Sequence, residues 1–253
     1  MRLKDKVALI TGAGAGLGKA TALRFAQEGA KVVVAEINEA NGSATAAAIR
    51  QSHGIAEFVQ TDISQEESIK ALVAATIKRF SRIDVLFNNA AVLFHKHDAR
   101  AHELSTEIWD KTHTTNLRGV WLTSKYVIPW MLQQGGGSII HLASPTGMSG
   151  CAPGLTAYSS SKGGVIALTR VMAVDYAKDN IRVNAIVPGT MDTPMNADLL
   201  SNAQSRERLV QMAPAGRLGT ADDISGLAVF LASEDSRYCV GGLYMVDGGL
   251  TAA

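Results

Sequence analysis

The sequence predicts an α/β protein, a single doubly wound domain in which a seven-stranded parallel sheet carries helices on both faces. Short apolar and β-branched runs alternate with stretches of helical length along all 253 residues. The runs are apolar throughout, as strands buried on both faces of a parallel sheet are. No linker or low-complexity tract divides the chain. Strand–helix–strand repetition of this kind gives a parallel sheet covered by helices.

Each element can be placed on the chain by its pattern. The expected strands are Val7–Ile10, Lys31–Ala35, Ala56–Val59, Asp84–Phe87, Ser138–Leu142, Arg182–Val187 and Leu243–Val246. The expected helices are Leu17–Gly29, Ala40–Ser52, Gln65–Phe80, Thr106–Gln133, Ala157–Lys178 and Asp222–Ser233. Pro129 should kink or break the fourth helix, because proline has no amide hydrogen to donate. Segments 92–104, 144–156 and 188–215 do not fit the repeat. Each follows a strand, where ligands bind in open α/β sheets, and 188–215 is expected to cover the substrate.

Composition and charge narrow the function classes. The net charge of +1 gives no global field to attract a nucleic acid or an anionic membrane. No apolar run approaches the roughly 20 residues of a membrane span, and Val7–Ile10 is too short for the core of a signal peptide. Cys151 and Cys239 form neither a CxxC nor a metal cluster. We therefore expect a cytoplasmic protein without a metal, and without nucleic-acid or membrane partners.

A glycine-rich turn follows the first strand and opens a helix. Residues 11–18 read TGAGAGLG, which does not match the strict G-x-G-x-x-G pattern. Glycines nevertheless allow a tight turn and let the backbone approach a pyrophosphate, which helix N-terminal amides then bind. The position between a strand and a helix predicts a dinucleotide site.

Two carboxylates follow the next strands. Glu36 ends the second strand, where an acid can accept hydrogen bonds from an adenosine ribose and repel a 2′-phosphate. No arginine or lysine stands at 13–17 or 37–38 to receive such a phosphate, so NAD is preferred over NADP. A solvated loop acid is the alternative. Asp62 could hold the adenine amine or, alongside Ser64, cap the next helix.

Tyr158 and Lys162 are spaced i, i+4 on a predicted helix and can share one site. A cation about 4 Å from the phenol, at an effective dielectric of about 20, would favour phenolate by about 4 kcal/mol. This would bring the tyrosine pKa from near 10 into the working range of an acid/base group. Taken alone, Tyr-x-x-x-Lys is common and usually structural.

The full set of motifs is more specific. The glycine turn, Asn88-Asn89-Ala90-Ala91, Asn116, Ser144, Tyr158 with Lys162, and Pro188-Gly189 occur in one order. Together with 214–219 and 246–249 they resemble the short-chain dehydrogenase/reductase family, in its compact branch of about 250 residues, over essentially the whole chain. The resemblance implies a Rossmann-type fold and hydride transfer between an alcohol or sugar hydroxyl and a nicotinamide.

The resemblance also implies residue roles. Tyr158 would be the general acid/base, Ser144 would bind the substrate oxygen, and Asn116 would anchor a proton-relay water. Lys162 would bind the nicotinamide ribose and lower the tyrosine pKa. The implied cofactor-binding residues are Gly12, Gly16, Leu17, Gly18, Glu36, Asp62, Ile63, Asn88, Ala90, Tyr158, Lys162, Pro188, Gly189 and Thr193. Ser144 could instead be a turn serine and Asn116 a polar residue at a helix kink.

Three features depart from the family pattern. Glu36 stands where aspartate is more usual, and Ala90-Ala91 includes an alanine where glycine is common. The interval from Ser144 to Tyr158 is one residue longer than usual, which concerns the shape of loop 145–156.

The substrate is the least constrained feature. His95, Lys96, His97, Arg100 and His102 lie within eight residues of a loop at the expected pocket rim, opposed by Asp98. This cluster could bind an anionic, sugar-like alcohol, with a solvated basic loop as the simpler alternative. Methionines in 191–212 leave an apolar alcohol possible. The competing functions are an NADPH-dependent 3-oxoacyl-thioester or ketone reductase and a nucleotide-binding protein without catalysis. Apolar surface on 106–133 and 157–178 and the resemblance both indicate a homotetramer or dimer.

Overall fold

The computed structural model describes residues 1–253 and has the seven-stranded parallel sheet that the sequence predicts. Its strand order is β3-β2-β1-β4-β5-β6-β7, so the chain reverses direction across the sheet between β1 and β4. The strands are β1 (Val7–Thr11), β2 (Lys31–Glu36), β3 (Ile55–Gln60), β4 (Val85–Asn88), β5 (Gly137–Leu142), β6 (Ile181–Pro188) and β7 (Leu243–Val246). Ligands bind at such a reversal, beyond the carboxyl ends of the strands.

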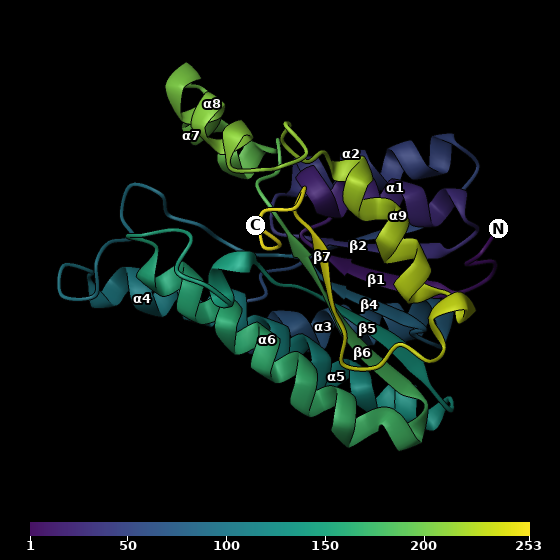
Figure 1. Ribbon diagram of the computed structural model, residues 1–253. Helices are drawn as coiled ribbons and strands as arrows, with labels where there is room; N and C mark the ends of the chain where they lie inside the picture. Colours follow the sequence, from purple (N-terminus) through teal and green to yellow (C-terminus); the bar gives the residue numbers. More distant parts are fainter.

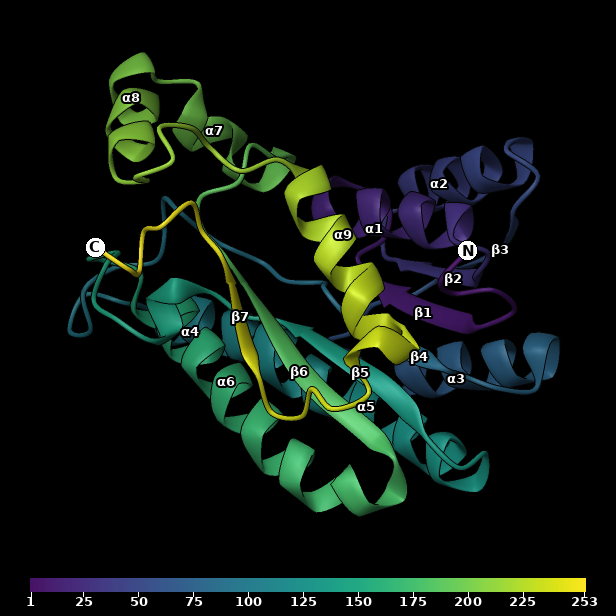
Figure 2. The same cartoon turned by 45° about the vertical axis from the view of Figure 1, so that its right-hand side comes forward.

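Helices cover both faces of the sheet (Figure 1). One layer holds α1 (Gly16–Gln27), α2 (Glu39–Gln51) and α9 (Ala221–Ala232). The other holds α3 (Glu66–Phe80), α4 (Thr106–His113), α5 (Gly119–Gln133) and α6 (Thr156–Tyr176), as the turned view in Figure 2 also shows. Strand residues alternate between the two cores: Ile10 packs toward α1 and α9, whereas Leu9 packs toward α3 and α5. No helix has the length and apolar composition to span a bilayer.

The fourth predicted helix is interrupted at a different place than expected. α5 continues through Pro129 to Gln133, so the break expected at Pro129 is wrong. Buried Val127, Ile128 and Met131 pack this turn against the sheet, which offsets the single hydrogen bond that proline removes. The irregularity is a π-helical turn, Thr114–Arg118, between α4 and α5. Such turns often occur at functional sites, and this one carries Asn116.

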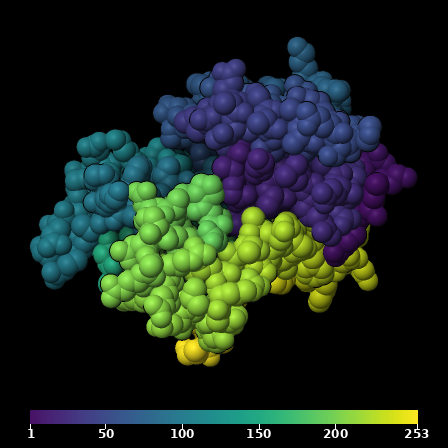
Figure 3. All heavy atoms as spheres, turned by 90° about the horizontal axis from the view of Figure 1, so that it is seen from above, coloured from purple at the N-terminus to yellow at the C-terminus, as the bar shows by residue number.

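The segment after β6 is more helical than its sequence suggests. It contains a 3₁₀ turn (Pro194–Asn196), α7 (Ala197–Leu200) and α8 (Ala203–Gln211), which project from the body of the molecule (Figure 1). From above, this green segment lies between the purple N-terminal part and the teal loop that follows β4 (Figure 3). The segment is therefore placed over the carboxyl ends of the strands.

Candidate active site

The carboxyl ends of the central strands open into a pocket of about 360 Å³. Most of the residues singled out from the sequence line it, namely Gly12, Gly16, Leu17, Glu36, Asp62, Ile63, Ala90, Ser144, Tyr158, Lys162, Pro188, Gly189 and Thr193. The remaining predicted site residues, Gly18, Asn88, Asn116, His95, Lys96, His97 and Arg100, are not in its wall. The tertiary fold thus gathers residues from Gly12 to Thr193 into one cleft.

The glycine turn lies very close to the loop after β4. Gly12 has φ +64°, and a Cβ there would lie 2.9 Å from Cα of Ala90. A Cβ on Gly18 would lie 2.2 Å from the carbonyl oxygen of Gly12, so any side chain would push the turn off the helix. These two positions require glycine because backbone meets backbone there.

The first turn of α1 is built to receive an anion. Its N-cap residue, Ala15, offers no side-chain hydrogen bond, and the first turn holds no acidic residue. The helix amides are therefore free for a ligand, and the helix dipole favours negative charge at this end. Thr193 and Pro194 lie just under 4 Å from the position of a Cβ on Gly16, so the segment after β6 covers this turn. These features fit a dinucleotide pyrophosphate.

Glu36 is fixed beside that turn. One carboxylate oxygen accepts a hydrogen bond from the Gly14 amide at 3.0 Å and the other from the Asn38 amide at 3.0 Å. The acid is therefore held at the pocket wall and is not a freely solvated loop residue.

Asp62 takes part in a local turn. Its carboxylate accepts from the Ser64 amide at 2.9 Å, and its own amide donates to the Ser68 hydroxyl at 3.0 Å. The N-cap residue of α3 is Gln65, so Asp62 stabilises the turn before α3 and is not the helix cap that the sequence offered as one alternative. Asp62 also lines the pocket, so the turn and a contact to adenine are compatible.

Tyr158 and Lys162 lie on the first turns of α6, with the ammonium nitrogen 5.7 Å from the centroid of the tyrosine ring. Lys162 is only 2 % exposed, and its ammonium donates to the Leu142 carbonyl oxygen at 2.7 Å. Burial lowers the pKa of Lys162 to about 8, because the low-dielectric surroundings disfavour its charged form.

The expected lowering of the tyrosine pKa does not occur in this structure. Desolvation by the surrounding protein raises the pKa of Tyr158 to about 12, and an opposing hydrogen bond with Ser144 is too weak to reverse this. The physical reason is desolvation, because protein atoms around the phenol replace water and disfavour its charged form. Tyr158 by itself is therefore protonated at neutral pH.

Ser144 also has the turn role that was the alternative for it. It precedes the 3₁₀ turn Pro145–Gly147, and its hydroxyl accepts from the amide of Thr146 at 3.3 Å and from its hydroxyl at 3.1 Å. The same hydroxyl acts on the pKa of Tyr158. The turn assignment is confirmed, and binding of the substrate oxygen by Ser144 stays a prediction.

Asn116 is fully buried and does not line the pocket. Its amide oxygen accepts from the amide of Val92 at 2.8 Å, and its amide nitrogen donates to the Val92 carbonyl at 2.9 Å and to the Ser161 hydroxyl at 3.3 Å. With these partners, its side chain fixes the chain after β4 against α6. Thr115, next to it, is the residue of the π-helical turn that lines the cleft.

Of the two adjacent asparagines at the end of β4, Asn89 lines the pocket and Asn88 does not. Asn88 is buried and donates to the Ser124 hydroxyl at 3.1 Å, because the last residue of β4 faces α5. Its neighbour Asn89 lines the pocket and donates to the carbonyls of Thr11 and Gly12 at 2.9 and 3.1 Å. The sequence shows two adjacent asparagines after the strand. Because successive side chains of a strand point to opposite faces, only one of them can face the pocket. Ile37, Thr61, Val92, Met195 and Asn196 are further lining residues that the sequence did not single out.

The basic residues of the rim loop, residues 92–104, are paired with polar groups. Lys96 is held by Asp198 at 2.8 Å, and His95 lies 3.3 Å from the side-chain oxygen of Asn196. Arg100 lies 4.0 Å from Glu103. The cluster therefore binds the segment after β6 and its own loop.

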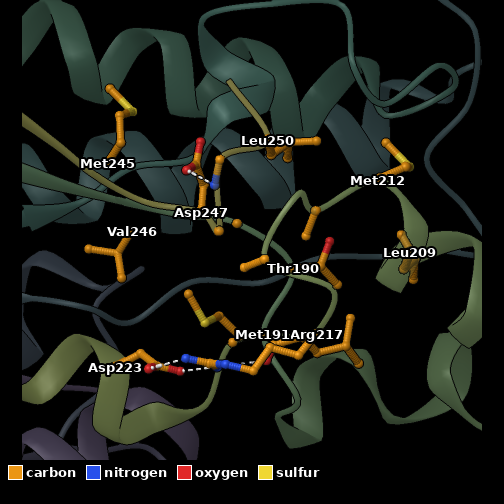
Figure 4. Close-up of a pocket in the computed structure, with 17 residues that line it drawn as sticks. Thr190, Met191, Leu209, Met212, Arg217, Asp223, Met245, Val246, Asp247 and Leu250 are labelled. Carbon is orange, nitrogen blue, oxygen red and sulfur yellow. Dashed lines mark hydrogen bonds and ion pairs between the residues drawn. The ribbon is translucent and has the colours of Figure 1, made fainter. Parts of the chain in front are cut away.

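A second cavity, of about 270 Å³, adjoins the cleft and shares Gly189 and Met191 with it. Figure 4 shows the residues that line this second cavity. Met191, Met212 and Met245 contribute its thioethers. The Arg217–Asp223 ion pair lies along one side. Met191 thus belongs to the wall between the cavities.

Comparisons with known proteins agree with this geometry. The family model described as enoyl-(acyl carrier protein) reductase matches residues 12–251. A 3-oxoacyl-(acyl-carrier-protein) reductase of Thermotoga maritima is 39 % identical, with 99 % of each chain covered. Levodione reductase of Leifsonia aquatica is 37 % identical over 100 % of this chain and 96 % of its own.

Solved structures agree as well. A levodione reductase crystal structure superposes with a TM-score of 0.95 at 35 % identity, covering 100 % of both chains. A structure from Beutenbergia cavernae, provisionally assigned as an NAD(P)-dependent gluconate 5-dehydrogenase and holding NADP at low occupancy, gives 0.93 at 34 % identity and covers 99 % of this chain and 98 % of its own.

Proposed function

Because this chain belongs to the short-chain dehydrogenase/reductase family, we propose that it transfers a hydride between NAD and a secondary alcohol or sugar hydroxyl, or the matching ketone. One observation carries the proposal. A single pocket holds Glu36 beside an uncapped helix N-terminus at one end and Ser144, Tyr158 and Lys162 at the other. Bound NAD would supply the hydride acceptor at its nicotinamide ring. Along its whole length, the dinucleotide would be lined by Gly12, Gly16, Ala90, Gly189 and Thr193.

The acid/base step follows from the environment of the phenol. With a pKa of about 12, Tyr158 is a proton donor at neutral pH, suited to protonating the oxygen of a ketone as it is reduced. The Ser144 hydroxyl, beside the phenol, would hold that oxygen in place. In the oxidative direction Tyr158 must first lose its proton, so oxidation is favoured at alkaline pH. Asn116 acts here by fixing Val92 beside the cleft.

The preference for NAD rests on Glu36. A carboxylate held by the amides of Gly14 and Asn38 would repel a 2′-phosphate, and Lys162 is the only cation in the pocket wall. We expect kcat/KM for NAD to exceed that for NADP by at least tenfold, and Glu36→Ala to narrow this ratio. Steady-state kinetics with both cofactors measures it, with exposed Glu39→Ala as the control. A wild-type preference for NADP would contradict the proposal.

The second candidate is an NADPH-dependent reductase of 3-oxoacyl thioesters or ketones. The similarity to the Thermotoga maritima reductase supports it, and Glu36 argues against it. The cofactor comparison above separates the two candidates.

The pocket wall favours a neutral substrate. Besides Ser144 and Tyr158 it offers Val92, Met195 and Asn196, and the two acids, Glu36 and Asp62, are its only charges other than Lys162. An anionic sugar-like substrate remains the second class, supported by similarity to the gluconate dehydrogenase and by the cations of the rim loop.

The double variant Lys96→Ala/Arg100→Ala tests the anionic class. Two probes are used, anionic gluconate and the neutral diketone levodione. If the cations bind the anionic group, KM for gluconate rises about tenfold or more with kcat unchanged, as lost uniform binding predicts. KM for levodione should stay constant in either case. An unchanged KM for gluconate would remove the rim cations from substrate binding.

We further propose one catalytic domain over residues 1–253, with 188–215 covering the substrate, in a cytoplasmic homotetramer. Support for assembly comes from an apolar face on α5 and α6, where Trp121 is 45 % and Val171 53 % exposed. A shallow groove runs between these helices beside Leu117 and Leu168. Exposed apolar faces of this kind mark subunit contacts.

A further inference from the structure

Helix α6 begins without a cap of its own. Its N-cap residue, Leu155, makes no side-chain hydrogen bond, and its first turn contains no acidic residue. Unpaired amides at a helix start need a partner, and here the third helical residue is Tyr158. The position of the phenol therefore depends on what holds this turn.

Asp98, some sixty residues earlier in the chain, supplies that partner. One carboxylate oxygen accepts from the amide of Ala157 at 3.0 Å and from that of Ala99 at 3.0 Å. The other accepts from the amide of Tyr158 itself at 2.9 Å. A carboxylate at this place satisfies two helix-start amides and complements the helix dipole.

The rim loop that carries Asp98 is fixed on both sides of the cleft. Its first residue, Val92, is held by Asn116 through both backbone groups. Between Val92 and Asp98, His95 contacts Asn196 and Lys96 pairs with Asp198 in the segment after β6. The carboxylate is thus held on a loop whose position both the π-helical turn and the covering segment define.

We propose that Asp98 is a positioning residue for the reaction, which holds the backbone of Tyr158 and so sets where the phenol meets the substrate oxygen. This inference rests on the function proposed above. Displacing a catalytic group by about 1 Å can cost two orders of magnitude in rate. Asp98 would therefore act on kcat through Tyr158, without touching the substrate or the cofactor.

The test compares Asp98→Ala, Asp98→Asn and the control Glu103→Ala, an exposed acid of the same loop. With the better of levodione or gluconate, at a temperature where every variant is fully folded, kcat should fall about 10- to 100-fold in Asp98→Ala. It should fall less in Asp98→Asn, which keeps one acceptor, and not at all in the control. The Kd for NADH should change less than twofold. A cap that were merely structural would lower Tm and leave kcat unchanged, which would overturn the proposal.

Hydrogen–deuterium exchange of residues 156–162 gives a readout that does not need turnover. Loss of protection in Asp98→Ala and its retention in Glu103→Ala are expected. Unchanged protection contradicts the positioning role, even if the wild-type protein oxidises no alcohol. Absent turnover in the wild type with normal protection would instead contradict the proposed function.

Discussion

Tyr158→Phe is expected to lower kcat by roughly 1,000-fold, within the range that general acid/base groups contribute. The substitution removes the hydroxyl that would exchange a proton with the substrate oxygen and keeps the ring that packs at the pocket wall. NADH should still bind with nearly wild-type affinity, because the glycine turn and Glu36 are untouched. Stopped-flow or steady-state absorbance at the NADH band measures the loss.

The matched control is Tyr176→Phe, which removes a hydroxyl at the far end of the same helix. It should leave kcat unchanged. Wild-type turnover by Tyr158→Phe would show that another group transfers the proton and would remove Tyr158 from the acid/base role.

Lys162→Met is expected to change how stability depends on pH. Burial holds the pKa of Lys162 at about 8 in the folded protein, below its ordinary 10.5, so the unfolded chain binds more protons between these values. The free energy of unfolding contributed by this group therefore rises with pH from about 8 to about 10.5, by about 3 kcal/mol in total. The variant lacks the group and should lack that rise.

Urea unfolding of wild type and Lys162→Met at several pH values from 7 to 11 gives the difference directly. Subtracting the free energy of unfolding of the variant from that of the wild type at each pH removes the contributions of the titrating groups that both proteins share, including Tyr158. The control Lys178→Met removes an exposed lysine just after the same helix and should show no such rise in the difference. Parallel pH curves for wild type and Lys162→Met would mean that the lysine is not buried with a lowered pKa. Activity of Lys162→Met should fall at least 100-fold, since the ammonium also lies beside the phenol.

Several features were predictable because their cause is local in the chain. Buried parallel strands require runs such as Val32–Ala35, and a turn in which backbone meets backbone requires Gly12 and Gly18. The i, i+4 spacing of Tyr158 and Lys162 follows from the helical period alone. These signals were enough for the fold class and for most of the cleft.

Other features depended on packing and could not be predicted from the pattern. Pro129 leaves α5 intact because its neighbours are buried, and Asn89 rather than Asn88 reaches the pocket because of the strand pleat. The pKa of Tyr158 rises where the sequence predicted a fall. The sequence gives the spacing of Tyr158 and Lys162 along the helix, but it does not show how far the phenol is desolvated. Desolvation depends on every atom around the phenol.

The order of strands and helices and the position of the glycine turn follow from the sequence alone. Side-chain periodicity and backbone sterics depend on residues close together in the chain. The tertiary structure alone decided that Asp98 meets the amide of Tyr158 and that Lys96 is paired with Asp198. Both contacts join residues sixty or more positions apart. Which amide or ammonium a carboxylate binds depends on where the fold places it, and the sequence pattern does not give that position. Local sequence thus supplies the reactive groups of the cleft. Their positions relative to one another are set by contacts that form only once the sheet has formed.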